Sequence, residues 1–205
     1  MYLTKTPCWL KKIYPNFIWS MQPYEKAIYL TFDDGPHEIA TPFVLQQLSK
    51  YNAKATFFCI GKNVEAHPLL YQQIIASAHS IGNHTQNHLN GWKTNTDSYL
   101  KDILKAKKNI NSNLFRPPYG KMKRIQAKQL LQIKDTFKII MWDVLSGDFD
   151  TTISGEVCSN NVIKNATNGS IVVFHDSLKA MERLQVALPK VLQHFSENGF
   201  EFKSI

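Results

Sequence analysis

The chain has 205 residues, of which 43% are hydrophobic and 20% charged, and its formal net charge is +8. This composition is typical of an ordinary globular protein, and the length fits one domain with a substantial core. The lysines and arginines are spread along the sequence. The charge therefore predicts a solvated basic face, and no DNA- or RNA-binding signature accompanies it.

The three cysteines, Cys8, Cys59 and Cys158, are an odd number without close pairing, which argues against a disulfide framework. No stretch is long and apolar enough to predict a transmembrane segment. The first 20 residues are interrupted by lysines and prolines and lack the apolar run of a signal peptide. By sequence we therefore expect a cytoplasmic protein or a processed form.

Apolar, β-prone runs alternate with amphipathic helical patterns along the chain. Strands are predicted at residues 26–32, 54–60, 80–83, 114–116, 137–144, 170–174 and 200–205. Helices are predicted at residues 41–51, 97–110, 122–133 and 155–165, with another beginning at Pro68 and the last one ending near residue 198. This alternation predicts one α/β domain over residues 27–205 with a mostly parallel sheet, and an N-terminal segment, residues 1–26, that packs on it.

Local signals suggest where two of these helices begin or end. Thr41 is a plausible N-cap, with Pro42 at the first helical position. Gly199 suits the end of the last helix, and Pro189 either kinks that helix or starts its main part.

Two adjacent carboxylates, Asp33 and Asp34, follow the first predicted strand and precede a turn at Gly35 and Pro36. Neighbouring residues on a strand point to opposite sides, so the two acids need not have the same role. Carboxylates this close also resist being ionised together unless a cation or hydrogen bonds compensate. The pair is a candidate site, although a turn with solvated acids has the same pattern.

His84 and His88 are spaced i, i+4, so on a helical turn both rings face one way and can hold one metal ion. Taken alone, such a pair also occurs on surfaces and in cores. A carboxylate from elsewhere would complete a set that suits zinc or another divalent transition metal with open positions. Asp34 is the candidate third ligand, and Asp33 would then be the base beside the metal.

Three further polar clusters follow predicted strands. Arg116 lies in a loop with two prolines, where it would either orient Asp33 or cap loop carbonyls. Trp142 would wall a small apolar pocket or pack in the core. His175 directly follows a buried strand, a place suited to acid–base work or to a structural hydrogen bond. In an α/β barrel, active sites are built at the carboxyl ends of the strands, where all these clusters are predicted to fall.

Taken in order, these clusters resemble the five motifs of the polysaccharide deacetylase family, also called NodB-like or carbohydrate esterase family 4. They are residues 31–36, the His84 and His88 pair, residues 116–119, residues 142–149 and the strand into His175. The resemblance runs from about residue 27 to the C-terminus, and five motifs in order favour the family over coincidence. It implies a distorted (β/α)7 barrel with one divalent metal ion, zinc or alternatively cobalt, that hydrolyses an N-acetyl or O-acetyl group on a sugar.

The resemblance also implies roles for the matched residues. Asp33 would be the catalytic base, Arg116 would tether that base, and His175 would be the general acid. The backbone N–H of Tyr119 would help to stabilise the oxyanion. The metal ligands would be Asp34, His84 and His88, and the pocket for the acetyl methyl group would be lined by Trp142 and Val173.

The fourth motif departs from the family pattern, which often reads Asp-x-x-Asp-Trp. Leu145 replaces the first Asp and Phe149 replaces the Trp. Asp148 remains, and it would orient His175 and raise its pKa; Asp143 is the alternative if the register differs. The departure affects the tuning of the acid and the choice of substrate, and it leaves the metal ligands unchanged.

The leading hypothesis is a metal-dependent hydrolase that removes acetyl groups from N-acetylated sugars of peptidoglycan, a chitin-like glycan or an exopolysaccharide. The expected partner is that glycan, with no nucleic acid, and the chain is expected to be a monomer. One alternative keeps the fold and the metal but acts on O-acetyl esters or on cyclic imides and ureides. Another is a glycan-binding protein without turnover. The family often acts outside the cytoplasm, in contrast to the location expected from this N-terminus.

Overall fold

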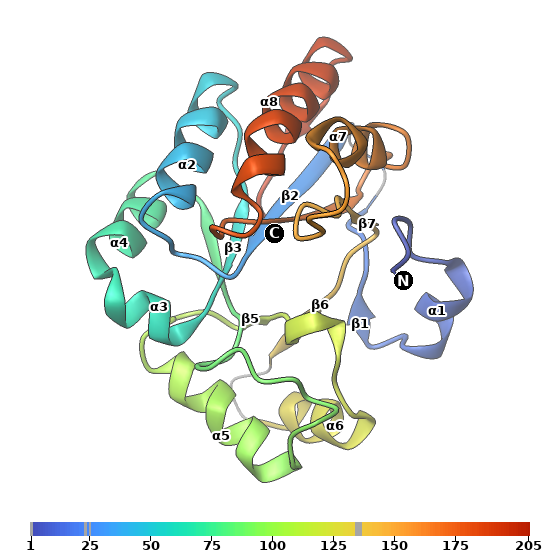
Figure 1. Cartoon of the computed structure of the whole chain (residues 1–205). Coiled ribbons are helices and arrows are strands. Elements are labelled where there is room, and N and C mark those ends of the chain that lie inside the picture. Colours follow the sequence, from blue (N-terminus) through green and yellow to red (C-terminus); the bar gives the residue numbers. More distant parts are fainter. Residues whose placement is uncertain (1, 23, 25, 134–136) are drawn as a thin grey trace.

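A computed structural model describes residues 2–22, 24, 26–133 and 137–205. Figure 1 shows short strands at the centre with helices around them. The strands are β1 (Phe17–Ile18), β2 (Ala27–Asp33), β3 (Thr56–Cys59), β4 (Ser80–Asn83), β5 (Leu114–Phe115), β6 (Lys138–Ile140), β7 (Val144–Leu145), β8 (Ile171–His175) and β9 (Glu201–Phe202). The helices are α1 (Cys8–Ile13), α2 (Ala40–Lys50), α3 (Gly61–Ala66), α4 (Pro68–Ala76), α5 (Thr96–Lys107), the 3₁₀ turn η1 (Pro118–Gly120), α6 (Arg124–Leu131), α7 (Gly155–Ile163) and α8 (Met181–Glu197). Within the described ranges, no helix has the length and apolarity needed to cross a bilayer.

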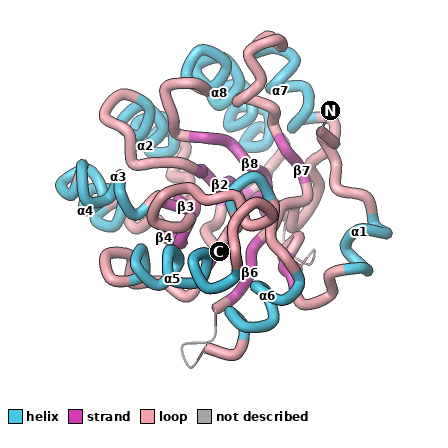
Figure 2. The backbone as a smooth tube through the Cα atoms, turned by 60° about the horizontal axis from the view of Figure 1, so that its bottom comes forward, coloured by secondary structure: helices cyan, strands magenta, loops and turns pink. Residues whose placement is uncertain are grey.

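The strands form one curled sheet in the order β1-β6-β5-β4-β3-β2-β8-β7, and β9 pairs with β2. The pairings between these strands are parallel. Helices cover the outside of this sheet, as the second view also shows (Figure 2). The predicted α/β fold, a distorted barrel with parallel strands, is confirmed. Parallel pairing places the carboxyl ends of the strands at one end of the barrel.

The N-terminal segment, which contains β1, lies across the gap between β6 and β7 (Figure 1). β1 pairs with β6, and Lys5 forms an antiparallel bridge with Val144 of β7. The Leu145 N–H donates to the Thr4 carbonyl at 2.8 Å. The segment therefore supplies backbone partners to both β6 and β7, which would otherwise expose unpaired strand groups.

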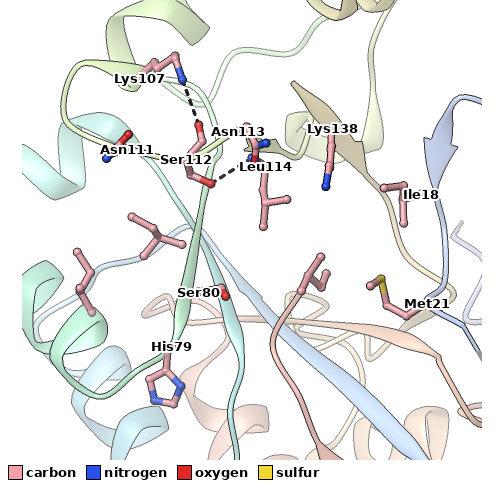
Figure 3. A pocket seen from close by; sticks show the side chains of 13 residues that line it. Ile18, Met21, His79, Ser80, Lys107, Asn111, Ser112, Asn113, Leu114 and Lys138 are labelled. Carbon is pink, nitrogen blue, oxygen red and sulfur yellow. Dashed lines mark hydrogen bonds between the residues drawn. The ribbon is translucent and has the colours of Figure 1, made fainter. Parts of the chain in front are cut away.

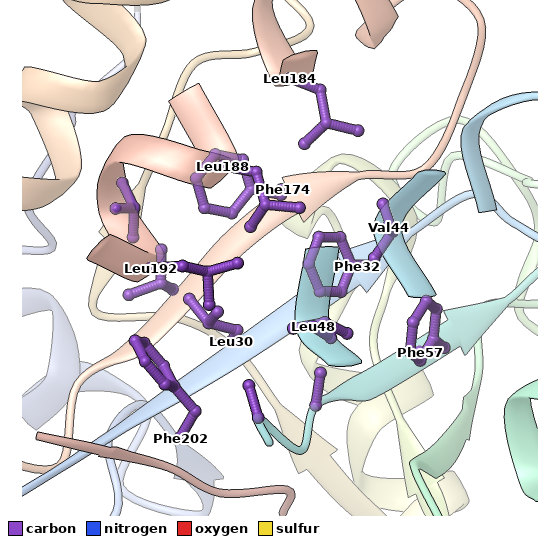
Figure 4. Packing of buried hydrophobic residues seen from close by; sticks show 14 of the residues in the cluster. Leu30, Phe32, Val44, Leu48, Phe57, Phe174, Leu184, Leu188, Leu192 and Phe202 are labelled. Carbon is purple, nitrogen blue, oxygen red and sulfur yellow. The ribbon is translucent and has the colours of Figure 1, made fainter. Parts of the chain in front are cut away.

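The side chains of β2 alternate between the two faces of the sheet. Leu30 and Phe32 point outward into an apolar core with α2 and α8, where Leu48 and Leu188 meet them (Figure 4). Fully burying one such side chain contributes about 1.5–3 kcal/mol. Thr31 and Asp33 point the other way, into the barrel. The same pattern that builds the core thus aims Asp33 at the barrel interior.

Some predicted boundaries are wrong. α2 begins at Ala40 with Ile39 as its N-cap, so Thr41 is not the cap and Pro42 is not the first helical residue. The single strand expected over residues 137–144 is two strands, β6 and β7, which pair with different neighbours. α1 and α3 were not predicted, because each has only 6 residues and a weak periodic signal.

Other local predictions are confirmed. α4 begins at Pro68 and β4 spans the expected residues. α8 begins at Met181 and runs through Pro189, so of the two alternatives for this proline, the one in which it starts the main part of the helix is wrong. Gly199 has a φ of 71°, the left-handed conformation typical of the residue that follows a helix C-cap. Cys59 is fully buried, and all three cysteines are free thiols.

Candidate active site

The predicted polar clusters meet in one cavity of about 610 Å³ at the carboxyl ends of the strands. Its walls include both adjacent acids, both histidines of the pair and His175. Asp33 and His175 are neighbours in the β2–β8 register, so both side chains point into the barrel. A cavity of this size is within the range of small-molecule sites.

Asp34, His84 and His88 form a three-residue donor set. The Nε2 atom of His88 lies 3.1 Å from Oδ1 of Asp34, and Nε2 of His84 lies 3.6 Å from the same oxygen. One ligand atom from each residue fits within 4.8 Å of the others. That Oδ1 atom is buried, and the described residues give it no hydrogen bond of good geometry. Because a buried carboxylate oxygen is costly without a partner, the set fits a bound cation.

The protonation of His84 favours metal binding. Its Nδ1 lies 2.8 Å from the Arg116 carbonyl, which can only accept, so Nδ1 carries the proton and Nε2 keeps its lone pair. Burial lowers the pKa of His84 to about 4, against the opposing effect of Asp33. Burial raises the pKa of Asp34, but His88, His175 and His84 together bring it below its usual range. A neutral imidazole and an ionised carboxylate are the ligand forms that a divalent cation requires.

The histidine pair lies in a loop, so the expected helical turn is wrong. Thr85 and His88 have φ values of 64° and 56°, and these left-handed residues bring the two rings to a centroid distance of 5.1 Å. The loop is held by Asp102 of α5, whose carboxylate accepts from the N–H groups of residues 86 and 87. Asp34 also has a positive φ, 80°. Strained backbone of this kind is common where a site fixes its ligands.

Asp33 is held by Arg116. The guanidinium Nη1 donates to Oδ1 of Asp33 at 2.7 Å and to the Thr31 hydroxyl at 2.7 Å. Arg116 is fully buried, with its guanidinium 4.1 Å from the centroid of the Phe58 ring and its other N–H groups donating to backbone carbonyls. Arg116 therefore binds Asp33 and also caps backbone carbonyls, so the two alternatives expected for it occur together. Burying this pair is tolerated because the charges are paired and hydrogen-bonded.

His175 is paired with Asp148. Nδ1 of His175 lies 2.7 Å from Oδ1 of Asp148, and the His175 backbone N–H donates to Oδ2 at 2.6 Å. Asp148 is fully buried and its carbonyl accepts from Arg183. Burial lowers the pKa of His175, but Asp148 and then the two adjacent acids outweigh this and raise it to about 10. The pairing with Asp148 therefore favours the imidazolium form of His175, with Nε2 left as its second donor.

Asp143, the alternative partner for His175, is engaged elsewhere. Its carboxylate accepts from Lys5 and Lys11 of the N-terminal segment at 2.6 and 2.7 Å, and from the Ser170 hydroxyl at 2.6 Å. Burial raises the pKa of Asp143, and the bonds from Lys11, Lys5 and Ser170 bring it below its usual range. The register with Asp148 beside His175 is the one that the structure has.

The apolar side of the cavity is made by Trp142 and Val173, together with the two departures of the fourth motif, Leu145 and Phe149. The Phe149 ring lies 5.4 Å from the His175 ring, edge to face. Tyr2 packs against Phe149 at 5.0 Å and also lines the cavity. Tyr119 has a φ of 61° at the rim, and its ring lies 4.6 Å from that of His88.

Besides Asp102, two contributions were missed by sequence reasoning. Asp176 is buried, and its carboxylate accepts from the Gly35 N–H at 3.0 Å and the Thr41 hydroxyl at 2.5 Å. A Cβ at residue 35 would lie 2.0 Å from that carboxylate, which explains the glycine after the two acids. Burial raises the pKa of Asp176 to about 8. The only sequence signal for Asp176 is its position directly after His175. The second missed contribution is Tyr2, which no local sequence signal connects to the site.

Two histidines and one carboxylate form a set of metal ligands, and beside them lie an aspartate bound by arginine and a histidine–aspartate pair. On a parallel barrel, these groups define a metal-assisted hydrolase site. The family model described as polysaccharide deacetylase matches residues 20–135. A peptidoglycan-N-acetylglucosamine deacetylase of Bacillus cereus is 35% identical over 193 residues, which cover 91% of this chain and 90% of the relative. The chain belongs to the polysaccharide deacetylase family.

Other relatives agree with this assignment. A chitooligosaccharide deacetylase of Azorhizobium caulinodans is 33% identical over 161 residues, 74% of each chain. The crystal structure of the Bc1960 peptidoglycan N-acetylglucosamine deacetylase, in complex with 4-naphthalen-1-yl-N-oxidanyl-benzamide, has a TM-score of 0.88 and 31% identity. That match covers 98% of this chain and 95% of the solved one. The barrel described above is thus the NodB-like fold.

Proposed function

We propose that this protein is a metal-dependent deacetylase that removes the acetyl group from N-acetylated sugars of a poly- or oligosaccharide. One observation carries the proposal: three groups with complementary chemistry lie together in one cavity. They are the set of candidate metal ligands, a carboxylate bound by arginine and a histidine bound by aspartate. The relatives described above are named as a peptidoglycan-N-acetylglucosamine deacetylase and a chitooligosaccharide deacetylase. These names support N-acetylglucosamine as the sugar of the substrate.

The proposed ligands of one divalent cation are Asp34, His84 and His88. Two imidazoles and one carboxylate leave positions open for water and substrate, a set that favours zinc, with cobalt as the alternative. When bound, the cation supplies Lewis acidity toward the acetyl carbonyl and the attacking water, whose pKa it brings toward about 7.

Asp33 is the proposed general base. Its Oδ1 is fixed by the 2.7 Å bond from Arg116, so the carboxylate has one orientation from which to accept the proton of the attacking water. General-base catalysis by a positioned side chain contributes about 10²–10⁴-fold to a rate. Arg116 acts through Asp33 and is a positioning residue.

His175 is the proposed general acid. An amine is a poor leaving group until it is protonated, so the sugar nitrogen must receive a proton as the C–N bond breaks. Asp148 occupies Nδ1 of His175, and Nε2 is the atom left to deliver that proton. A base and an acid in one site need separated pKa values, and the raised pKa of His175 meets this condition.

The remaining proposed roles concern the acetyl group itself. The Tyr119 backbone N–H would donate to the developing oxyanion, and one such positioned donor is worth about 3 kcal/mol. Trp142 and Val173 would enclose the methyl group, because both line the apolar side of the cavity. We also propose that residues 27–205 form the catalytic domain, with residues 1–26 packed on it. A monomer suffices, since every site residue named here comes from one chain.

The test is acetate release from N-acetylglucosamine oligomers by the purified protein, after chelation and again after zinc or cobalt is restored. Asp33→Asn serves as the variant without a base. We expect release that depends on the metal and is lost in the variant. Metal-dependent hydrolysis of acetyl esters or cyclic imides without release from oligomers would move the protein to another substrate class. Binding of oligomers without any hydrolysis would leave a glycan-binding protein.

A further inference from the structure

Tyr2 of the N-terminal segment lies at the wall of the candidate active-site cavity. Its ring centroid is 5.0 Å from that of Phe149, and its hydroxyl donates to Oδ2 of Asp150 at 3.0 Å. The backbone beside it is fixed as well, because the Thr4 carbonyl accepts from the Leu145 N–H. Tyr2 is therefore docked on the loop that follows β7 by its ring, its hydroxyl and the neighbouring backbone.

The same loop holds His175. Three consecutive residues, Asp148, Phe149 and Asp150, each make a separate contact. Oδ1 of Asp148 lies 2.7 Å from Nδ1 of His175, and the Phe149 ring lies 5.4 Å from the His175 ring at an interplanar angle of 73°. Asp150 accepts from Tyr2. A series of direct contacts thus runs from Tyr2 through this loop to His175.

Asp148 fixes only one point of the His175 ring. A hydrogen bond at Nδ1 sets a distance, but the ring can still tilt about that bond. The edge-to-face contact with Phe149 limits this tilt, and aromatic pairs favour such a geometry. Phe149 is only half-buried, so it needs a packing partner of its own, and the Tyr2 ring is one.

Gly147 leaves room for the docking of Tyr2. A Cβ at residue 147 would lie 2.7 Å from the Tyr2 hydroxyl. Gly147 also has a φ of 83°, a left-handed conformation that favours glycine. A side chain here would strain the turn and displace the hydroxyl that bonds Asp150. The glycine therefore suits the docked tyrosine as well as the turn itself.

We infer that Tyr2 is a positioning residue of the proposed reaction, which acts through Phe149 to keep His175 aimed at the leaving nitrogen. The inference rests on the proposed function and deepens it. In that step Nε2 of His175 gives its proton to the sugar nitrogen, which takes the electron pair of the breaking C–N bond. The N-terminal segment then contributes to catalysis as well as to the pairing of the sheet.

The leaving group separates this role from other effects of a substitution. The sugar amine leaves only after protonation, so its release depends on the aim of His175. 4-Nitrophenolate is a stable anion, and it leaves an acetyl ester without receiving a proton. A loss confined to the amide therefore reports on the acid, whereas damage to the metal ligands or to the fold would slow both reactions.

The experiment compares the zinc-loaded protein and three variants on N-acetylglucosamine oligomers and on 4-nitrophenyl acetate. Tyr2→Ala should lower kcat for the oligomers about tenfold, part of the roughly 10²–10⁴-fold that a general acid supplies, and should change kcat for the ester less than about twofold. Tyr2→Phe keeps the ring and should keep most of the activity on the oligomers. Tyr24→Ala is the matched control, at a tyrosine of the same segment that is 87% exposed and does not line the cavity, and it should behave as wild type.

A second readout needs no turnover. The Phe149 ring shifts the NMR signals of the His175 ring protons by an amount that depends on the distance and orientation of the two rings. His175→Gln assigns these signals by their loss. Tyr2→Ala should move them, and Tyr24→Ala should leave them in place.

The outcomes are separable from those of the proposed function. Equal losses on the amide and the ester, or His175 signals that stay in place in Tyr2→Ala, would overturn the positioning role. A loss in Tyr2→Phe as large as that in Tyr2→Ala would overturn the path through the Phe149 ring. If the wild-type protein releases no acetate, the deacetylase is rejected, whereas His175 signals that move in Tyr2→Ala would still show that Tyr2 holds this ring.

Discussion

The two ends of the barrel both open into cavities, and the larger one lies away from the proposed chemistry. At the amino ends of β4, β5 and β6 a cavity of about 1020 Å³ is lined by Ser80, Leu114, Lys138 and their neighbours (Figure 3). The cavity at the carboxyl ends is about 610 Å³. Among the described residues, the donor set, Asp33 and His175 all line the smaller cavity. The difference teaches that convergent chemistry, and not volume, marks a site.

Half-buried His79 and buried His84 make the same comparison at the level of one residue type. His79 lines the larger cavity and His84 the smaller, and burial lowers the pKa of each to about 4. His79 accepts a bond from the Ala55 N–H at 3.3 Å and satisfies the backbone. His84 donates to a backbone carbonyl and presents its second nitrogen to a carboxylate. The direction of the hydrogen bond, and not the lowered pKa, distinguishes a candidate ligand from a structural histidine.

The largest expected effect is the loss of the base. Asp33→Asn should lower kcat for acetate release about a thousandfold, because the amide cannot accept the proton of the attacking water. Zinc content should change little, since Asp33 is not among the three proposed ligands. The midpoint of thermal unfolding should fall, because the fully buried Arg116 loses its charged partner. Full activity in the variant would show that the proton goes elsewhere.

The next effect concerns metal binding. His84→Ala should weaken zinc binding at least a hundredfold, measured by competition with a chromogenic chelator, because the change removes one of three ligands. His79→Gln is the matched control at the other end of the barrel and should leave the zinc affinity unchanged. Equal loss of affinity in both variants would mean that the smaller cavity is not the metal centre.

The pH profile tests the histidine–aspartate pair. Asp148 raises the pKa of His175, so Asp148→Asn should lower it and move the alkaline limb of kcat/KM toward lower pH by a unit or more. A bound cation nearby also opposes the imidazolium charge, and it does so in both proteins. The raised pKa also stabilises the fold; that contribution is full below about pH 6.5 and is lost as the pH rises through about 10. An unshifted alkaline limb would mean that His175 is not the acid.

The smallest effect is expected at the larger cavity. Lys138→Glu reverses a charge on its exposed wall and should change kcat/KM by less than about twofold, since it lies at the opposite ends of the strands. Acetate release from oligomers measures this directly. A loss of tenfold or more would bring the larger cavity into the function and would end the contrast between the two ends.

The positions of the site residues followed from periodicity and from strand ends, which are local properties of the sequence. Asp33 and His175 end adjacent parallel strands, and alternation along each strand aims them at the same space. Asp34 could not be placed this way: the strand ends before it, and its left-handed backbone turns its carboxylate toward the histidines.

The contributions that escaped sequence reasoning are set by long-range contacts. Tyr2 reaches Asp150 across 148 residues of sequence, and Lys5 reaches Asp143 across 138. No pattern within a window of the sequence encodes such a pairing. Asp176 is similar, because it accepts from the Gly35 N–H across 141 residues, whereas Asp102 holds loop N–H groups only 15 and 16 residues before it.

The most direct test of the central claim is the anomalous diffraction of crystals of the zinc-loaded protein, recorded at the zinc edge. The account predicts one strong peak within bonding distance of Asp34, His84 and His88, at the smaller cavity. A peak at the larger cavity beside His79, or none at the three proposed ligands in crystals of protein shown to bind zinc, would contradict it.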